Sequence, residues 1–252
     1  MIADFLSRAL LVAFRIGGLM TFAPFFSNAA VPARVKAALT FLFAVLLVPV
    51  YSTASKPLTI VSWTAMAAGE IVLGLMMGFT TQFVFDGMEL AGQIAGFQFG
   101  FSLVNAIDPN TEVETTVLSS FHEFVALLIF MQLGVHRWLI RAVAASFRVI
   151  PLGRLAAAPV SAPEILRMAG AMWLVGVEIA FPVLFATMLI DLTIGFLSKA
   201  SPQFPAIFFG ISAKTLVGLA ILYGVIAFWP VTLERYFFHA LANLETLLAL
   251  AR

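Results

Sequence analysis

The sequence contains no cysteine. This absence excludes a disulfide framework, a thiolate nucleophile and a cysteine-ligated metal site. The three histidines, His122, His136 and His239, are isolated from one another, and His122-Glu123 lacks the second histidine of a zinc-protease helix. No glycine-rich phosphate loop ending in Lys-Ser or Lys-Thr is present either. We therefore predict a protein that is not an enzyme, with no catalytic, cofactor-binding or metal site.

Charge is also scarce, because only 11% of the 252 residues are charged and the net charge is +1. A soluble domain keeps roughly a quarter of its residues charged to cover its surface. In contrast, 62% of this chain is hydrophobic, and phenylalanine alone occurs 26 times. The surface must therefore face lipid, other apolar chains, or both, and nothing in the charge indicates a nucleic-acid partner.

The apolar residues gather in long runs, and a helix needs about 20 of them to cross a bilayer. Five of the runs reach that length, and none alternates as a membrane barrel strand does. Backbone groups in lipid must be paired within the chain, so these runs predict helices. We expect an all-α membrane protein of about six to eight long, kinked hydrophobic helices, forming a single integral membrane unit over 1–252. The runs span 5–26, 37–50, 58–85, 121–143, 166–197 and 206–229, with a tail at 231–251.

The segment 86–120 differs from the other runs. It has five acidic residues and no lysine or arginine, it is rich in glycine, and Phe97, Phe99 and Phe101 alternate with Gln98 and Gly100. Irregular backbone at membrane depth survives only inside protein or beside a water-filled cavity. One interpretation is a re-entrant or pore-lining segment, in which the extended chain places the three phenylalanines on one face. The other is an ordinary helix end followed by a loop outside the membrane.

Five charges stand alone inside apolar runs: Arg15, Glu70, Glu178, Asp191 and Lys214. A charge at mid-bilayer costs about 2.5–3.5 kcal/mol on insertion scales, so each should face protein or water. They could form a proton or ion path, or they could be paired structurally with charges on other helices or subunits. We favour pairing, because relays gather acids on one helix face. Glu178 and Asp191 lie about 220° apart around a helix.

Glycines recur at intervals of four residues in two places. Small residues at this spacing let helix backbones approach closely. We expect them to support tight packing, either within the chain or with partners. They are Gly74 and Gly78, followed by Gly92, Gly96 and Gly100.

Several stretches, in order and spacing, resemble one known family over about 5–230. The block from Ala91-Gly92-Gln93 through Phe97-Gln98-Phe99-Gly100-Phe101 to Asp108-Pro109 is the most telling. The family is FliR, the flagellar type III export-gate protein, whose injectisome relatives are called SctT. The other matching stretches are Arg15, Met20, Pro24-Phe25, Val31 to Lys36, Pro49, Gly69-Glu70, Gly74, Gly78-Phe79, Gly134 to His136, Ser146-Phe147, Pro151 to Gly153, Pro182, Asp191, Ser201 to Gln203, Gly210 and Lys214.

The resemblance implies a structural, pore-forming role rather than catalysis. Such a protein joins FliP- and FliQ-type subunits, with FlhB- and FlhA-type proteins as further partners, in the bacterial inner membrane at the flagellar basal body. Unfolded flagellar proteins pass through the pore. The resemblance also implies helices bent into hairpins and packed against partners, with much of the complex above the lipid plane.

A loop of this family resembles a plug that closes the resting channel, and the matching positions here run from about Phe97 to Ser120. The alternative from another class is a secondary transporter of a small solute or ion, since broken helices and intramembrane charges suit both. Inverted repeats would favour the transporter, and the sequence shows none. The residues expected to form the plug are Phe97, Phe99, Phe101, Leu103, Val104, Ile107, Asp108 and Pro109.

Overall fold

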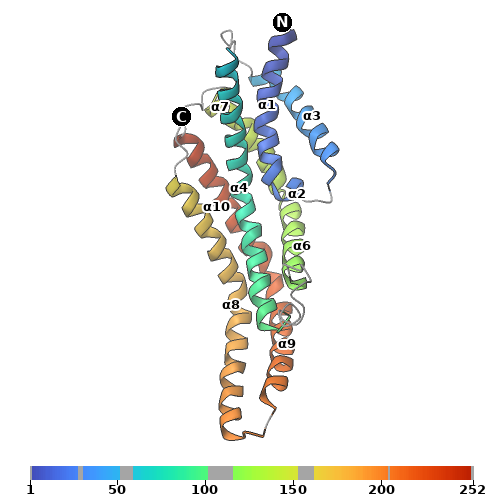
Figure 1. Ribbon diagram of the computed structural model, residues 1–252, viewed down its shortest axis with the longest axis vertical. Helices are drawn as coiled ribbons and strands as arrows, with labels where there is room; N and C mark the ends of the chain where they lie inside the picture. Colours follow the sequence, from blue (N-terminus) through green and yellow to red (C-terminus); the bar gives the residue numbers. More distant parts are fainter. Residues whose placement is uncertain are drawn as a thin grey trace. The chain divides into compact units, whose positions relative to one another are not determined.

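A computed structural model of the chain describes six stretches of residues and shows only helices and turns within them. Its long helices follow the apolar runs, which confirms the all-α membrane architecture (Figure 1). The described stretches are 2–27, 31–51, 59–101, 116–152, 162–203 and 205–250. The helices are α1 (Ile2–Phe22), α2 (Pro24–Ser27), α3 (Ala33–Tyr51), α4 (Ile60–Gln98), α6 (Val117–Gln132), α7 (Val135–Val149), α8 (Ala162–Ala200), α9 (Ala206–Val225), the 3₁₀ turn η2 (Ile226–Phe228) and α10 (Trp229–Leu250).

The chain divides into two compact units, and four of the described helices, α4, α6, α8 and α10, have residues in both. The first unit comprises 1–83, 130–169 and 237–252. The second comprises 84–129 and 170–236. The long helix α4 therefore contributes residues 60–83 to the first unit and 84–98 to the second, whereas α8 lies mostly in the second unit.

In the first unit, α1 packs against α3 and against the first half of α4. Val12, Met77, Leu139 and Leu244 are almost completely buried there. The rings of Phe22 and Phe79 stack with their centroids 3.9 Å apart. In lipid, close packing of such side chains against one another holds the helices in contact.

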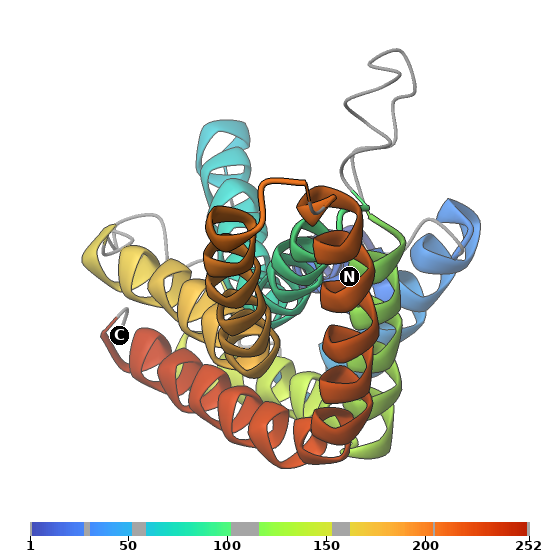
Figure 2. The same ribbon diagram turned by 90° about the horizontal axis from the view of Figure 1, so that it is seen from below.

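In the second unit, α8 and α9 form a hairpin joined by a short connection around Pro202, as Figures 1 and 2 both show. Met88 from α4 and Leu233 from α10 are fully buried in this unit. The ring of His122 from α6 lies 4.7 Å from that of Trp229. The helical hairpin agrees with what the family resemblance implied for this part of the chain.

The apolar run 121–143 is not one straight span. It is divided between α6 and α7, which meet at a bend of 66°. Gly134 lies at the bend with a φ of 70°, in the left-handed region that favours glycine. Among the described residues, four helices are long and apolar enough to cross a membrane, or five segments if this bent pair is counted as one span.

The sequence interpretation of 86–120 as irregular backbone is wrong for its first part. Residues 86–98 continue α4 as regular helix. The helix ends at Gln98, and Gly100 follows with a φ of 81°. The amide of Phe101 donates to the carbonyl of Gly96 at 3.0 Å. Such a left-handed glycine cap satisfies carbonyls that the last helical turn leaves open. Gly100 therefore acts as the cap that terminates the helix.

Candidate functional site

The lone charges of the first unit meet in a buried cluster. The Nε atom of Arg15 in α1 lies 2.5 Å from Oε2 of Glu70 in α4, and both side chains are almost completely buried. The same guanidinium donates to Oγ of Ser146 at 3.0 Å and to the carbonyl of Ile150 at 3.1 Å. It also lies 4.2 Å from the ring centre of Phe147. A buried ion pair is tolerated when further hydrogen bonds satisfy the remaining donors, and this one is.

The remaining three lone charges are paired in the second unit. Lys214 of α9 forms an ion pair with Asp191 of α8. Glu178 of α8 lies 2.5 Å from Arg235 of α10, and the hydroxyl of Tyr236 donates to it. Each of the five lone charges therefore has an ion-pair partner, as the pairing interpretation requires.

Three partners of the lone charges, Arg235, Tyr236 and Ser146, were not identified as partners from the sequence. Arg235 and Tyr236 lie 57 and 58 residues from Glu178. Ser146 lies 131 residues from Arg15. The sequence shows only that Arg235 is a cation near an apolar run, and this does not identify which acidic residue it pairs with.

The described part of the predicted plug does not form an extended strip of phenylalanines on one face. Phe97 lies in the last turn of α4 and is 71% exposed, whereas Phe99 is 2% exposed. Phe101 is again exposed. Leu103, Val104, Ile107, Asp108 and Pro109 lie outside the described residues, so the plug itself remains a prediction.

Phe99 anchors the end of α4 against α9. Its ring occupies the space beside Gly218, where an added Cβ would lie 2.0 Å from the ring atom Cε1. The hydroxyl of Thr215 donates to the carbonyl of Phe99 at 3.1 Å. The predicted plug thus contains, near its start, a ring held in a notch that only a glycine permits. Neither Thr215 nor Gly218 was predicted.

The glycines of α4 make their close contacts within the chain. A Cβ on Gly74 would lie 2.0 Å from the carbonyl oxygen of Arg15 in α1, and one on Gly78 would lie 2.8 Å from that of Leu19. Further along α4, a Cβ on Gly92 would lie 2.5 Å from Cα of Ser119. Gly96 similarly faces the side chain of Thr116, which is 2.8 Å from such a Cβ. Of the two possibilities left open by the sequence, packing within the chain accounts for these four glycines.

Among the described residues, no three histidine, aspartate or glutamate side chains lie close enough together to hold a metal ion. The arrangement instead provides rigid helix packing, paired charges and an anchored segment. These are features of a structural membrane protein.

Comparison with known proteins agrees with this assignment. A family model described as "Bacterial export proteins, family 1" matches residues 6–240. The flagellar biosynthetic protein FliR of Escherichia coli (strain K12) is 29% identical over 213 residues, which cover 82% of this chain and 80% of that protein. FliR of Bacillus subtilis (strain 168) is 27% identical over 257 residues, covering 99% of this chain and 97% of that protein.

A relative of lower identity also matches along most of its length. FliR of Aquifex aeolicus (strain VF5) is 25% identical over 236 residues, covering 93% of this chain and 91% of that protein. The resemblance recognised from the ordered motifs is therefore confirmed over nearly the whole chain. The chain belongs to the FliR family of bacterial export proteins, family 1.

Proposed function

We propose that the chain is a structural, pore-forming component of the flagellar type III protein export gate. The observation that carries this is the family match over 6–240. In addition, the relatives that match most of this chain are flagellar biosynthetic proteins. The chain would reside in the bacterial inner membrane, within the flagellar basal body. It performs no catalytic step there and lines a path for unfolded flagellar proteins.

The partners in this proposal are FliP- and FliQ-type subunits, with FlhB- and FlhA-type proteins bound to the assembled gate. An apolar stripe along α8 supports association with other helices or lipid. Its side chains recur every three or four residues and are between 46% and 74% exposed. In lipid, helices associate through close packing, so such a stripe provides a surface for it. The stripe consists of Trp173, Val177, Phe181, Phe185, Met188, Leu192 and Phe196.

Within this proposal, residues 97–120 close the resting pore. The limbs of the segment are fixed at both ends in the second unit. Phe99 is held beside Gly218 at one end, and Ser119 packs against Gly92 at the other. Fixed ends allow the intervening chain to cover a passage at rest and to move aside without disturbing the helices.

The experiment that tests the proposed function is co-purification. The tagged chain is produced with the FliP- and FliQ-type proteins of its own organism, extracted in mild detergent, and weighed as an intact complex. A large hetero-assembly of defined mass is the expected result. A monomer or homodimer that binds a small solute would overturn the proposal in favour of a secondary transporter.

A further inference from the structure

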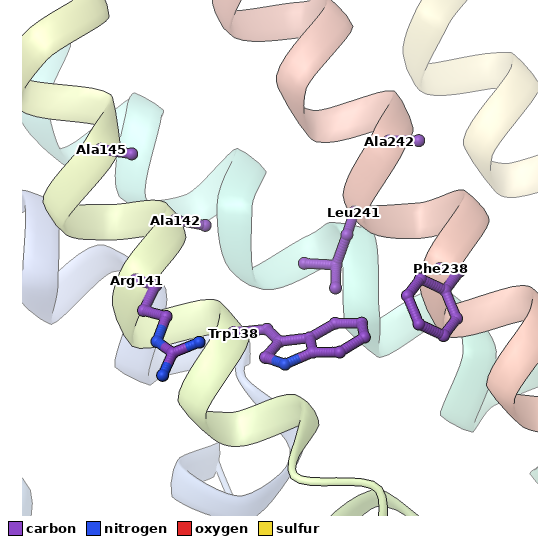
Figure 3. A pocket seen from close by; sticks show the side chains of 7 residues that line it. All are labelled: Trp138, Arg141, Ala142, Ala145, Phe238, Leu241 and Ala242. Carbon is purple, nitrogen blue, oxygen red and sulfur yellow. The ribbon is translucent and has the colours of Figure 1, made fainter.

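A pocket with a volume of about 450 Å³ lies between α7 and the second half of α10 in the first unit. Figure 3 shows the guanidinium of Arg141 beside the indole of Trp138, with Leu241 and Phe238 across from them on α10. The pocket is open rather than enclosed. Its volume falls within the range of about 300–1,000 Å³ that is common for sites of small ligands. The lining residues are Trp138, Arg141, Ala142, Ala145, Phe238, Leu241 and Ala242.

The sequence spacing explains why a hollow forms at this place. Its α7 residues recur at intervals of three, four and seven from Trp138, so they share one face of the helix. Three of the lining residues are alanines, whose short side chains leave the space between the helices unfilled. The rings of Trp138 and Phe238 pack edge to face with centroids 4.4 Å apart. The result is an apolar slot with an aromatic wall and a single cation at its edge.

The helix that forms one wall is strongly amphipathic. Val135, Leu139, Val143 and Phe147 of α7 are buried. Arg137, Arg141 and Arg148 are exposed, and at 100° per residue they fall within an arc of about 40° opposite that face. The helix contains no aspartate or glutamate.

We propose that this pocket binds one anionic phospholipid. The phosphate of the headgroup lies against Arg141 on the exposed cationic face, and an acyl chain enters the slot along Trp138, Leu241 and Phe238. Three features of the site favour this ligand: an amphipathic helix with a basic polar face, an amphipathic aromatic residue at its boundary, and an apolar slot opening beside the cation. Helices of this composition lie at the membrane interface, where basic side chains attract acidic headgroups. Tryptophan is enriched at the same depth.

A dissolved anion would bind Arg141 but leave the apolar slot empty. A lipid without net charge would fill the slot but would not pair with Arg141. A lipid with a negative headgroup uses both. Phosphatidylglycerol is the probe that represents this class, and phosphatidylcholine matches it in acyl chains while carrying no net charge.

The test measures quenching of Trp138 fluorescence by lipids brominated in the acyl chain. The full chain is reconstituted in phosphatidylcholine vesicles containing a small fraction of brominated phosphatidylglycerol or brominated phosphatidylcholine. The Trp138 contribution is the difference between the chain and Trp138→Phe, because the chain has four tryptophans. Brominated phosphatidylglycerol should reach half of its maximal quenching at about fivefold lower content than brominated phosphatidylcholine, as expected for one interfacial arginine.

Substitutions separate the two halves of the site. Arg141→Gln should abolish the preference for phosphatidylglycerol, and Arg141→Lys should retain part of it. Arg34→Gln is the matched control, because Arg34 is an exposed cation of the same unit on α3. Ala145→Leu fills the slot and should reduce quenching by both lipids.

Four outcomes with the chain alone would overturn the proposal, and a fifth would come from the assembly. They are equal quenching by the two lipids, a preference that survives Arg141→Gln, and quenching that survives Ala145→Leu in a folded chain. The fourth is displacement by millimolar inorganic phosphate, which would assign the site to a free anion. The same measurement on the assembly co-purified with its partners should keep the preference. Its loss there would mean that a partner chain occupies the pocket, and this too would overturn the lipid assignment.

Discussion

Arg15 keeps a full positive charge within an apolar unit because every part of its guanidinium has a partner. Glu70 accepts a hydrogen bond from Nε and neutralises the charge. Ser146 and the carbonyl of Ile150 each accept one from a terminal nitrogen, and the face of Phe147 covers the group. The partners come from α4 and the end of α7, so this one side chain of α1 ties three segments together. Removing one member leaves a buried charge that nothing compensates.

Replacing Glu70 with glutamine should therefore lower the free energy of unfolding by about 3–5 kcal/mol, the usual cost of breaking a buried pair. Arg15→Met combined with Glu70→Leu removes both charges and should recover most of that loss. Reversible unfolding of the purified chain in mixed detergent micelles measures both variants. Arg34→Gln, on the exposed side of α3, should leave the transition unchanged.

The Glu70→Gln variant also distinguishes structural pairing from a proton path. A pairing role lowers the yield of assembled complex equally with and without a proton gradient. Normal assembly combined with a failure of gradient-driven export alone would establish the relay interpretation instead.

Because Gly218 has no side chain, the ring of Phe99 can occupy the space beside it. Gly218→Ala would place a Cβ 2.0 Å from the ring, so the ring must leave its notch. We expect a loss of about 1–3 kcal/mol, as in other overpacked sites. Gly224→Ala lies on the same helix, where an added Cβ meets nothing within 4 Å, and it should have no such effect.

Single-cysteine labelling can follow this movement, because the natural chain has no cysteine. In a Phe101→Cys background, Gly218→Ala should accelerate reaction with a maleimide, and Gly224→Ala should not. An unchanged labelling rate in the destabilised Gly218→Ala protein would mean that Phe99 does not anchor the following segment.

Among the elements, α4 shows most directly how glycine spacing becomes helix packing. Gly74 and Gly78 let the backbone of α1 approach so closely that a Cβ at either site would overlap it. Gly74→Ala should separate the two helices and destabilise the first unit by about 1–3 kcal/mol. Gly170→Ala in α8 has open space around it and should instead stabilise its helix by up to about 1 kcal/mol. Thermal unfolding of the two variants beside the natural chain measures the difference. Equal stability of the two variants would contradict the packing role of Gly74.

The existence of long helices could be predicted from the sequence, because 20-residue apolar runs have few other solutions in lipid. Their ends and bends could not. The run 121–143 is continuous in hydropathy, yet the left-handed backbone of Gly134 divides it. Residues 86–98 look irregular because they are rich in glycine. Gly92 and Gly96 nevertheless face 116–119, Gly87 faces Val175, and the helix continues.

The candidate site shows the same division. The cost of isolated charge predicted that Arg15 and Glu178 would be paired, since this depends on composition alone. The partners depend on which distant helices meet, and Ser146 and Arg235 are 131 and 57 residues away. The notch at Gly218 depends on a contact between α9 and the end of α4, and no pattern of neighbouring residues in the sequence predicts that contact.

For the whole molecule, the function requires a passage for unfolded chains that holds back ions at rest. The described contacts of the predicted plug are at its two ends, Phe99 with Gly218 and Ser119 with Gly92. Removal of 105–115 leaves both ends intact, so the deleted chain should still assemble with its partners. Large apolar side chains seal narrow passages by excluding water, and the deletion removes Ile107 from the segment that we expect to do this.

Cells that overproduce the 105–115 deletion with its partner subunits should therefore leak ions or small solutes. Growth sensitivity and ion conductance in reconstituted membranes both report this leak. The matched control removes 154–160, another connector between helices, and should leave the membrane as tight as the intact complex does. If the 105–115 deletion assembles at the normal mass and stays equally tight, the segment is an ordinary loop, and the seal must be made by the helices themselves.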